Sequence, residues 1–290
     1  MEKSTATIAV VLIGLAAALL AALFYGAPSA LQAHASRRLP QAVWWRVLVA
    51  ALRDRMMLSV LVLYLVGAAA NYVAIQTLPL YLAQAATSVS LIFTALASAW
   101  WLGEWPFAHQ WTALVAVVLG LALLATGAGK AGGQPDRPHL VLGLYAGLVV
   151  STAIGFSCRW LTGHFSGVML GLFAGVSFAG VPLGTRLLDA PYWELRTVAV
   201  IAVIACYGIV GFALSTISLA RVQVNTATAP LILSQTLIPA VLGIAVFGDQ
   251  VRSDWGWAIV LGLVLSMLGT IGVSAIARPL AEEAAEKVEA

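Results

Sequence analysis

Charged residues are scarce in this sequence, and their scarcity sets the class of protein. Asp, Glu, Lys and Arg together make up 9% of the 290 residues, whereas soluble domains contain about 25%. Hydrophobic residues make up 61% of the chain, and the mean hydropathy is +0.97. This composition excludes a water-soluble globular protein, a disordered chain and a collagen-like chain. We expect most of the chain to lie in lipid.

Residues that carry out catalysis or bind metals are equally few. The two cysteines, Cys158 and Cys206, belong to no paired motif, and the four histidines are scattered without ligand spacing. The segment 127–130 ends in a lysine but lacks the spacing of a phosphate-binding loop, and no Ser/His/Asp grouping is present. We therefore expect a protein that is not an enzyme and that holds neither a cofactor nor a metal.

The stretches between ionisable residues are long enough to cross a bilayer. A transmembrane helix needs about 20 mostly apolar residues, and each charge-free stretch holds at least one such helix. The longest stretch, 56–103, holds two, divided near Pro79 because proline cannot donate a backbone hydrogen bond inside a helix. The sequence predicts nine spans, at about 7–27, 57–77, 80–101, 109–128, 140–158, 166–185, 197–218, 223–247 and 256–276.

The remaining loops and tails are too short to form a soluble domain, so an attached ATPase is excluded and any transport must draw on gradients.

Arginines concentrate in the loop 33–56, which places that loop in the cytoplasm and the N-terminus outside. Interleaved arginines and tryptophans favour a short interfacial helix in this loop; a tenth span is the alternative. The first apolar run is longer than a cleaved signal sequence usually is, so a permanent span is favoured.

Short motifs recur in the same order in the two halves of the chain. Gly26 and Pro28, at the end of the first predicted span, match Gly180 and Pro182 at the end of the sixth. Gly103-Glu104 matches Gly248-Asp249, and glycines spaced by seven residues follow each copy, at positions 120 and 127 and at positions 262 and 269. One extra span between the halves would insert the second half upside down, as in the inverted repeats of secondary transporters.

The predicted organisation follows from that repeat. It comprises a first transmembrane repeat at 1–135 with a basic cytoplasmic loop at 33–56, a linking span within 136–163, a second, inverted repeat at 164–278, and an acidic tail at 279–290. The fold class is therefore all-α, with two inverted four-helix repeats joined by one span. An excess of Arg over Lys and an abundance of Ala and Gly are typical of a GC-rich bacterial genome, so we expect a multi-pass protein of a bacterial inner membrane.

These motifs resemble those of the drug/metabolite transporter superfamily. The resemblance lies in Gly103-Glu104 after an aromatic-rich span end, its degenerate copy Gly248-Asp249, Pro239 in the span before that copy, and the glycine-rich helix after each. It implies an EamA-like fold of inverted repeats and the export of small metabolites. Because nine spans replace the usual ten, and a basic loop follows the first, the chain is also similar to the NIPA-type branch of magnesium transporters.

The two acidic residues of the repeated motif have a local explanation. Glu104 lies two residues before Pro106, at the start of the next predicted helix, where a carboxylate interacts favourably with exposed backbone N–H groups. Asp249 occupies the matching position before the last span. We expect both residues to stabilise the starts of those helices, on opposite faces of the membrane.

No ionisable Asp, Glu, Lys or Arg falls inside a predicted span, which disfavours a carboxylate relay for ions. Polar side chains in the spans are instead neutral and lie in stripes at helical spacing, so they should face other helices or a water-filled cavity. The candidate substrate-binding residues are Tyr25, Tyr64, Asn71, Gln76, Gln84, Thr87, Ser88, Asn225, Thr228 and Gln235. Interhelical hydrogen bonding is the alternative role for each of them.

The sequence thus predicts a secondary transporter that moves a small polar or zwitterionic metabolite by alternating access. One alternative is a magnesium transporter, although Mg²⁺ prefers carboxylate oxygens that the predicted spans lack. Another is a protein that binds lipid or acts as a scaffold without transporting anything. The expected partners are a small-molecule solute and membrane lipid, and the chain could also form a homodimer. The pI near 9.0 is explained by the basic loop 33–56, so we expect no binding of nucleic acid.

Overall fold

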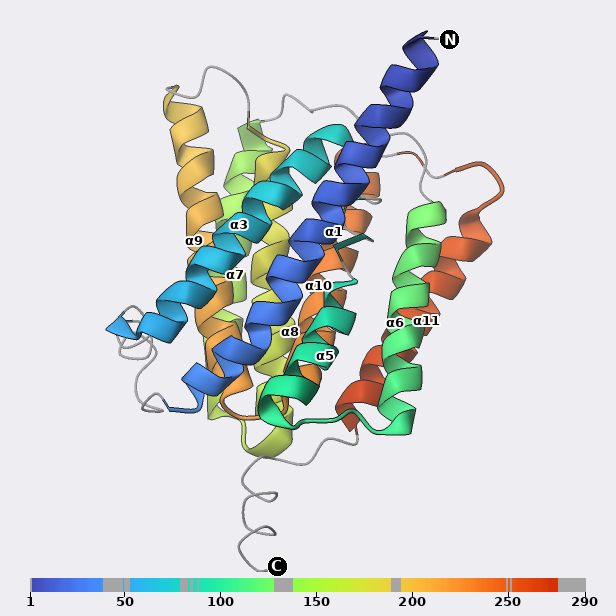
Figure 1. Ribbon diagram of the computed structural model, residues 1–290. Coiled ribbons are helices and arrows are strands. Elements are labelled where there is room, and N and C mark those ends of the chain that lie inside the picture. The colour runs from blue at the N-terminus through green and yellow to red at the C-terminus, as the bar shows by residue number, and fades with distance from the viewer. Residues whose placement is uncertain are drawn as a thin grey trace, which may run out of the picture.

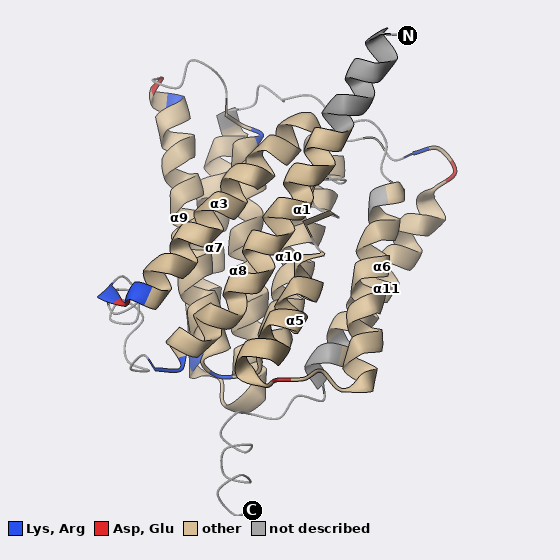
Figure 2. Ribbon diagram, viewed as in Figure 1, with Lys and Arg blue, Asp and Glu red and all other residues tan. Residues whose placement is uncertain are grey.

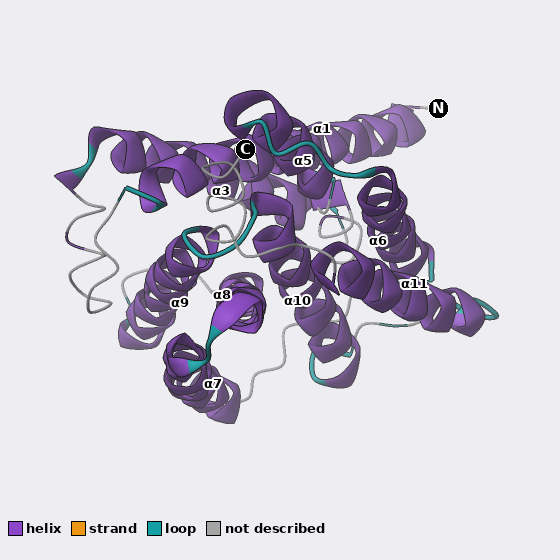
Figure 3. Cartoon of the chain, turned by 90° about the horizontal axis from the view of Figure 1, so that it is seen from below, coloured by secondary structure: helices purple, strands orange, loops and turns teal. Residues whose placement is uncertain are grey.

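The protein is an all-helical bundle, seen from the side in Figure 1 and along its axis in Figure 3. The computed structural model describes residues 2–38, 49, 53–78, 83, 86–87, 89–127, 138–188, 194–248, 250 and 252–275. No strand occurs within these residues. The α-helices are α1 (Glu2–Ser36), α3 (Arg55–Thr77), α5 (Ser90–Leu102), α6 (Ala108–Thr126), α7 (Pro138–Ser157), α8 (Gly163–Thr185), α9 (Leu195–Leu219), α10 (Val224–Ala245) and α11 (Gly256–Ala275), and a short 3₁₀ turn, η1 (Cys158–Trp160), follows α7.

Length and composition make this chain a multi-pass membrane protein. Six of the described helices, α1, α3, α7, α8, α9 and α10, are long and apolar enough to cross a bilayer, and α5, α6 and α11 contain shorter apolar segments. Large apolar side chains such as Leu65, Val149 and Leu268 stand on the outer surface of the bundle. Lipid is the solvent that such a surface requires.

Most predicted spans agree with a helix to within a few residues, but the first does not. We predicted that it ends at residue 27, whereas α1 continues without a break through Pro28 to Ser36. The predicted loop 33–56 therefore begins about one turn too early. The last two turns remain helical because Ser29, Gln32 and Ala33 are buried against other helices; tertiary packing here outweighs the missing hydrogen bond of proline.

Several predicted segments lie outside the described residues. They include most of the loop 33–56 after Arg38, the first half of the third predicted span with Pro79, the connection at 128–137 and the acidic tail at 279–290. Asp249 also lies outside them. The linking span predicted within 136–163 corresponds to α7 followed by η1.

The helices pack in two similar groups. α1 packs along both α3 and α5, and α8 packs along both α9 and α10, while α6 and α11 pair with each other. α1 runs from the upper to the lower end of the bundle in Figure 1, whereas α8 runs upward. α8 and α10 approach closely because Gly171 and Gly175 have no side chain to collide with the carbonyl oxygens of Ala227 and Leu231.

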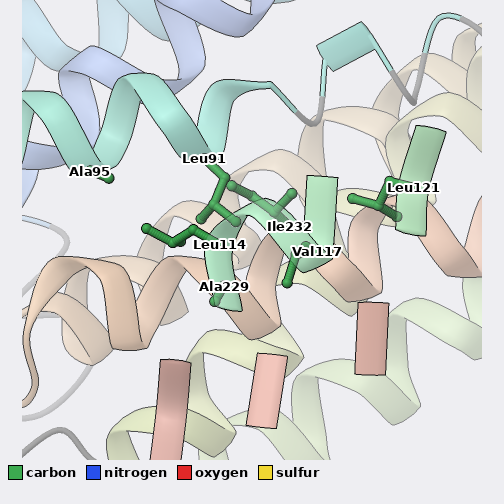
Figure 4. Close-up of a cluster of buried hydrophobic side chains, with 7 residues drawn as sticks. All are labelled: Leu91, Ala95, Leu114, Val117, Leu121, Ala229 and Ile232. Atoms are coloured by element: carbon green, nitrogen blue, oxygen red, sulfur yellow. The ribbon is translucent and has the colours of Figure 1, made fainter. Parts of the chain in front are cut away.

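A shared hydrophobic core joins the two groups. Figure 4 shows that side chains from α5, α6 and α10 meet in one cluster. Its buried members are Leu91, Ala95, Leu114, Val117, Leu121, Ala229 and Ile232. Helices distant in sequence are thereby fixed against each other in the middle of the bundle.

The charged residues that the structure describes lie at the two ends of the bundle, as Figure 2 shows. The lower end, which we call the basic end, is where α1, α7 and α9 finish and where α3, α8 and α10 begin. The arginines at these helix ends are Arg37, Arg38, Arg53, Arg55, Arg159 and Arg221, against Arg186, Arg196 and Arg252 at the opposite end. The described arginines therefore lie at the ends to which the predicted spans assigned them.

Candidate functional site

A fully buried glutamine connects helices from both groups. Gln32 of α1 is only 1% exposed. Its side-chain Nε2 donates hydrogen bonds to the hydroxyl oxygens of Ser215 and Thr216 on α9, both at 2.9 Å. Its Oε1 accepts a hydrogen bond of 2.7 Å from the hydroxyl of Tyr64 on α3. We call Gln32, Tyr64, Ser215 and Thr216 the polar network.

Local sequence explains how the network is held. Ser215 and Thr216 each donate their hydroxyl hydrogen to the carbonyl of Phe212, one turn earlier on α9, at 2.9 and 2.7 Å. Their oxygen lone pairs are consequently oriented toward Gln32. The ring of Phe212 also meets the ring of Tyr64 edge-on, with centroids 6.2 Å apart, which fixes the tyrosine for its bond to Gln32.

A second tyrosine extends the polar track along α1. The rings of Tyr25 and Tyr64 lie 6.4 Å apart, and Gly67 leaves room for the Tyr25 ring, since a Cβ there would approach two ring carbons to 3.0 Å. The Tyr25 hydroxyl interacts with the side chain of Asn71 on α3. Tyr25, Tyr64 and Asn71, predicted as site residues, are thus brought together.

Asn71 has a hydrogen-bonding atom to spare. Its Oδ1 is buried and has no hydrogen-bond partner among the described residues, and the residue is 9% exposed. An unsatisfied buried acceptor costs about 1–3 kcal/mol. A donor group of a water or of a bound solute would remove that cost, so Asn71 marks a place where a polar ligand can bind.

Two more unsatisfied polar atoms lie at the start of α10. Asn225 and Thr226 are 3% and 0% exposed, and Asn225 Oδ1 and Thr226 Oγ1 have no partner among the described residues. The predicted site residue Thr228 is also buried, but its hydroxyl donates to the carbonyl of Val224 at 2.8 Å. Buried polar atoms without a hydrogen-bond partner among the described residues are therefore present on α10 as well as on α3.

The other predicted site residues do not join the polar network. Thr87 is buried, Gln235 is half-buried on α10, and Gln76 is exposed near the end of α3. Gln84 and Ser88 lie outside the described residues. The network is accordingly smaller than the predicted set and is centred on α1, α3 and α9.

Sequence reasoning missed Gln32, Ser215 and Thr216. Gln32 was missed because the first span was ended at residue 27, although Tyr25, Ser29 and Gln32 have the spacing of one helix face. Ser29 is buried too, and its hydroxyl contacts that of Thr94 on α5 at 3.1 Å. A polar stripe on α1 would have been predicted had the helix been extended past Pro28.

Glu104 fastens the basic end of the bundle, but not in the predicted way. Its carboxylate forms an ion pair with Arg37 at the end of α1, and its Oε2 accepts a 2.9 Å hydrogen bond from the backbone N–H of Val224 at the start of α10. We predicted that it stabilises the start of the helix that follows it, α6. That prediction is wrong, because the side chain of Gln110 serves this start by accepting from Phe107 N–H at 2.9 Å.

The backbone around Glu104 explains its reach. Gly103 ends α5 in the left-handed region, with φ of +68°, a conformation in which glycine is favoured. The chain therefore turns away from α5 and carries Glu104 toward α1 and α10. Gly248 after α10 has the same left-handed conformation, with φ of +71°, so the two copies of the repeated motif share their backbone geometry at the glycine.

Comparison with known proteins gives no relative: no family model, no curated protein and no solved structure matches the chain.

Proposed function

We propose that this protein is a secondary transporter that moves a small polar or zwitterionic metabolite across the membrane by alternating access. The observation that carries the proposal is the polar network, in which Gln32 of α1 is bonded to both α3 and α9. These helices belong to different packing groups, and polar groups between moving halves are where a transporter binds its solute. The chain then functions in a cell membrane, which we infer to be bacterial.

Inverted repeats and nine crossings form part of this proposal. The pairing of α1 with α3 and α5 parallels the pairing of α8 with α9 and α10, and α6 and α11 contact each other. α1 and α8 run in opposite directions. A pseudo-twofold axis in the membrane plane that exchanges α1 with α8, α3 with α9, α5 with α10 and α6 with α11 would account for these pairings.

Membership of the drug/metabolite transporter superfamily is likewise proposed. It is supported by the left-handed glycines, Gly103 and Gly248, which begin the two copies of the Gly-acidic motif. Both follow a helix that contributes to the common core, α5 and α10.

The chemistry of the network favours an uncharged or zwitterionic solute. Its side chains are amides and hydroxyls, which offer both donors and acceptors, and Asn71 next to it offers a free acceptor. A net charge brought among neutral groups in a membrane is costly unless it is paired. In contrast, amino and hydroxyl groups of a metabolite can replace the present bonds one for one.

Closure at the basic end fits alternating access. Arg37, Glu104 and the start of α10 connect the first group of helices to the second through one ion pair and one backbone hydrogen bond. Breaking these two contacts would remove the polar links between α1 and α10 at that end and leave, among the described residues, only the apolar cluster of Ala33 with Val224 and Ala227. We infer that the described conformation is closed on the basic side.

Transport in proteoliposomes tests the proposed function. A collection of neutral and zwitterionic metabolites is first screened for ligands that raise the unfolding temperature, and flux of each ligand is then measured. Tyr64→Phe removes only the hydroxyl that bonds Gln32, and we expect flux to fall about threefold, the equivalent of one hydrogen bond of about 0.6 kcal/mol within a membrane. Tyr72→Phe is the matched control, because Tyr72 lies exposed on the same helix.

Three results would overturn the proposal. Equal flux for Tyr64→Phe and Tyr72→Phe would separate the polar network from transport. Flux of Mg²⁺ without flux of any metabolite would favour the magnesium transporter instead. Sealed vesicles that transport nothing would favour a lipid-binding or scaffold protein.

A further inference from the structure

A hollow of about 320 Å³ lies between α7 and α9, away from the polar network. Ala153 and Phe156 of α7 form one wall, and Ile209 and Ala213 of α9 form the other. Figure 3 places α7 at the edge of the bundle beside α8 and α9, and Ile209 is 52% exposed. The hollow is therefore an apolar groove on the lipid-facing surface, which we call the α7–α9 groove.

The groove ends at a pair of arginines at the basic end. Arg159 lines it together with Trp160, and the guanidinium of Arg159 lies over the Trp160 ring, 5.4 Å from its centroid. Arg221 lies beside Arg159, since its Nη1 donates to the Arg159 carbonyl at 3.1 Å. Burial and, to a smaller extent, the neighbouring charge of Arg159 lower the pKa of Arg221.

Neither arginine is neutralised by a carboxylate of the residues that the structure describes. The ion pair found among the described residues is the one between Arg37 and Glu104. Within the same residues, neither Arg159 nor Arg221 has a carboxylate within salt-bridge distance. Two adjacent cations without a counter-charge in the described part of the chain favour an anionic ligand. The exposed ring of Trp160, 73% accessible, has the amphipathic character that suits the headgroup level of a bilayer.

We propose that the α7–α9 groove binds an anionic phospholipid, with an acyl chain between Phe156 and Ile209 and the phosphate against Arg159 and Arg221. Ala153 lies on α7 one to two turns before Arg159 of η1, a rise of about 10 Å at 1.5 Å per α-helical and 2.0 Å per 3₁₀ residue, so the groove leads from headgroup level toward the bilayer interior. The apolar walls and the cationic end match the two parts of such a lipid. This site is independent of the proposed transport function, because it lies outside the polar network.

Native mass spectrometry of the intact protein tests this site with dioleoyl phosphatidylglycerol and dioleoyl phosphatidylcholine as probes. We expect the wild-type protein to retain the anionic lipid preferentially. Arg159→Gln should weaken its retention about fivefold, in line with the contribution of one arginine near an anionic surface. Ala153→Trp fills the exposed groove without entering the core and should weaken retention of the same lipid.

Matched controls separate a built site from general attraction. Arg55→Gln removes a charge from an exposed position at the same end of the bundle, and we expect the preference for the anionic lipid to persist in it. Glycerol phosphate carries the headgroup charge without acyl chains and should fail to displace the lipid. Equal retention of both lipids by the wild type, equal losses in Arg55→Gln and Arg159→Gln, or unchanged retention in Ala153→Trp would each overturn the proposal.

Discussion

The backbones of Gly120 on α6 and Gly262 on α11 lie in close, reciprocal contact, at almost equal distances in the two directions. A Cβ on Gly120 would lie 2.6 Å from the carbonyl oxygen of Gly262, and a Cβ on Gly262 would lie 2.5 Å from the carbonyl oxygen of Gly120. These glycines occupy matching positions in the two halves of the sequence. Matching residues contact each other when a twofold axis passes between them, so this reciprocal contact supports the proposed pseudo-symmetry.

The first prediction concerns this contact. Gly262→Ala should lower the free energy of unfolding by about 1–3 kcal/mol, because the added methyl group must push apart two helix backbones. Gly143→Ala on α7 is the control, since a Cβ there meets no atom within 4 Å; it should be neutral or stabilising by up to about 1 kcal/mol through higher helix propensity. Thermal unfolding in detergent measures both, and equal effects would contradict the close packing.

Helix positions were largely predictable from sequence, and the reason is the bilayer. Ionisable side chains are expelled to the ends of helices, so charge-free stretches alone located α3 and α7 through α11 to within a few residues. The end of α1 was missed because the first predicted span was stopped at residue 27, just before Pro28. Ser29, Gln32 and Ala33 beyond it stay helical through contacts with α5, α9 and α10, and such contacts are invisible in a single stretch of sequence.

The second prediction concerns Glu104. Glu104→Gln keeps an acceptor for the Val224 N–H but loses the ion pair, so it should cost about 0.5–1 kcal/mol of stability. Glu104→Ala also leaves the Val224 N–H without its acceptor and should cost about 1.5–3 kcal/mol more. A double-mutant cycle that combines Glu104→Gln with Arg37→Gln checks the pairing. Once the first substitution has broken the ion pair, the second should change the stability by almost nothing. Full additivity in unfolding experiments would exclude the ion pair.

The partners of Glu104 could not have been predicted from local sequence. The carboxylate was assigned to the nearest helix start, yet the N–H that it accepts belongs to a residue 120 positions later. Asn71 and Tyr25 were both predicted as site residues because each is polar within a long apolar stretch, and the structure brings the two side chains together. The partners of Gln32 on α9 could not be predicted in the same way, because Ser215 and Thr216 are two hydroxyl residues among many in this chain.

The third prediction tests the contact of α1 with α5. Thr94 accepts a hydrogen bond from the Ser29 hydroxyl at 3.1 Å and donates to the Gly26 carbonyl at 3.2 Å. Thr94→Val keeps the shape of the side chain and should cost about 0.6–1.7 kcal/mol, the range for hydrogen bonds between membrane helices. Thr112→Val on α6 is the matched control, since Thr112 is exposed and bonds only within its own helix. Indistinguishable unfolding temperatures for the two variants would contradict these interhelical bonds.

The fourth prediction separates the bonds of Gln32. In Gln32→Leu, Ser215 and Thr216 still donate to the Phe212 carbonyl, so the hydroxyl of Tyr64 is the group left without its partner. The single substitution should therefore cost about 1–3 kcal/mol. Adding Tyr64→Phe removes the stranded hydroxyl, and we expect the double variant to be as stable as Gln32→Leu or more stable, because the two residues share one hydrogen bond. Unfolding in detergent measures the three variants, and a double variant whose loss equals the sum of the two single losses would show that Gln32 and Tyr64 are not coupled.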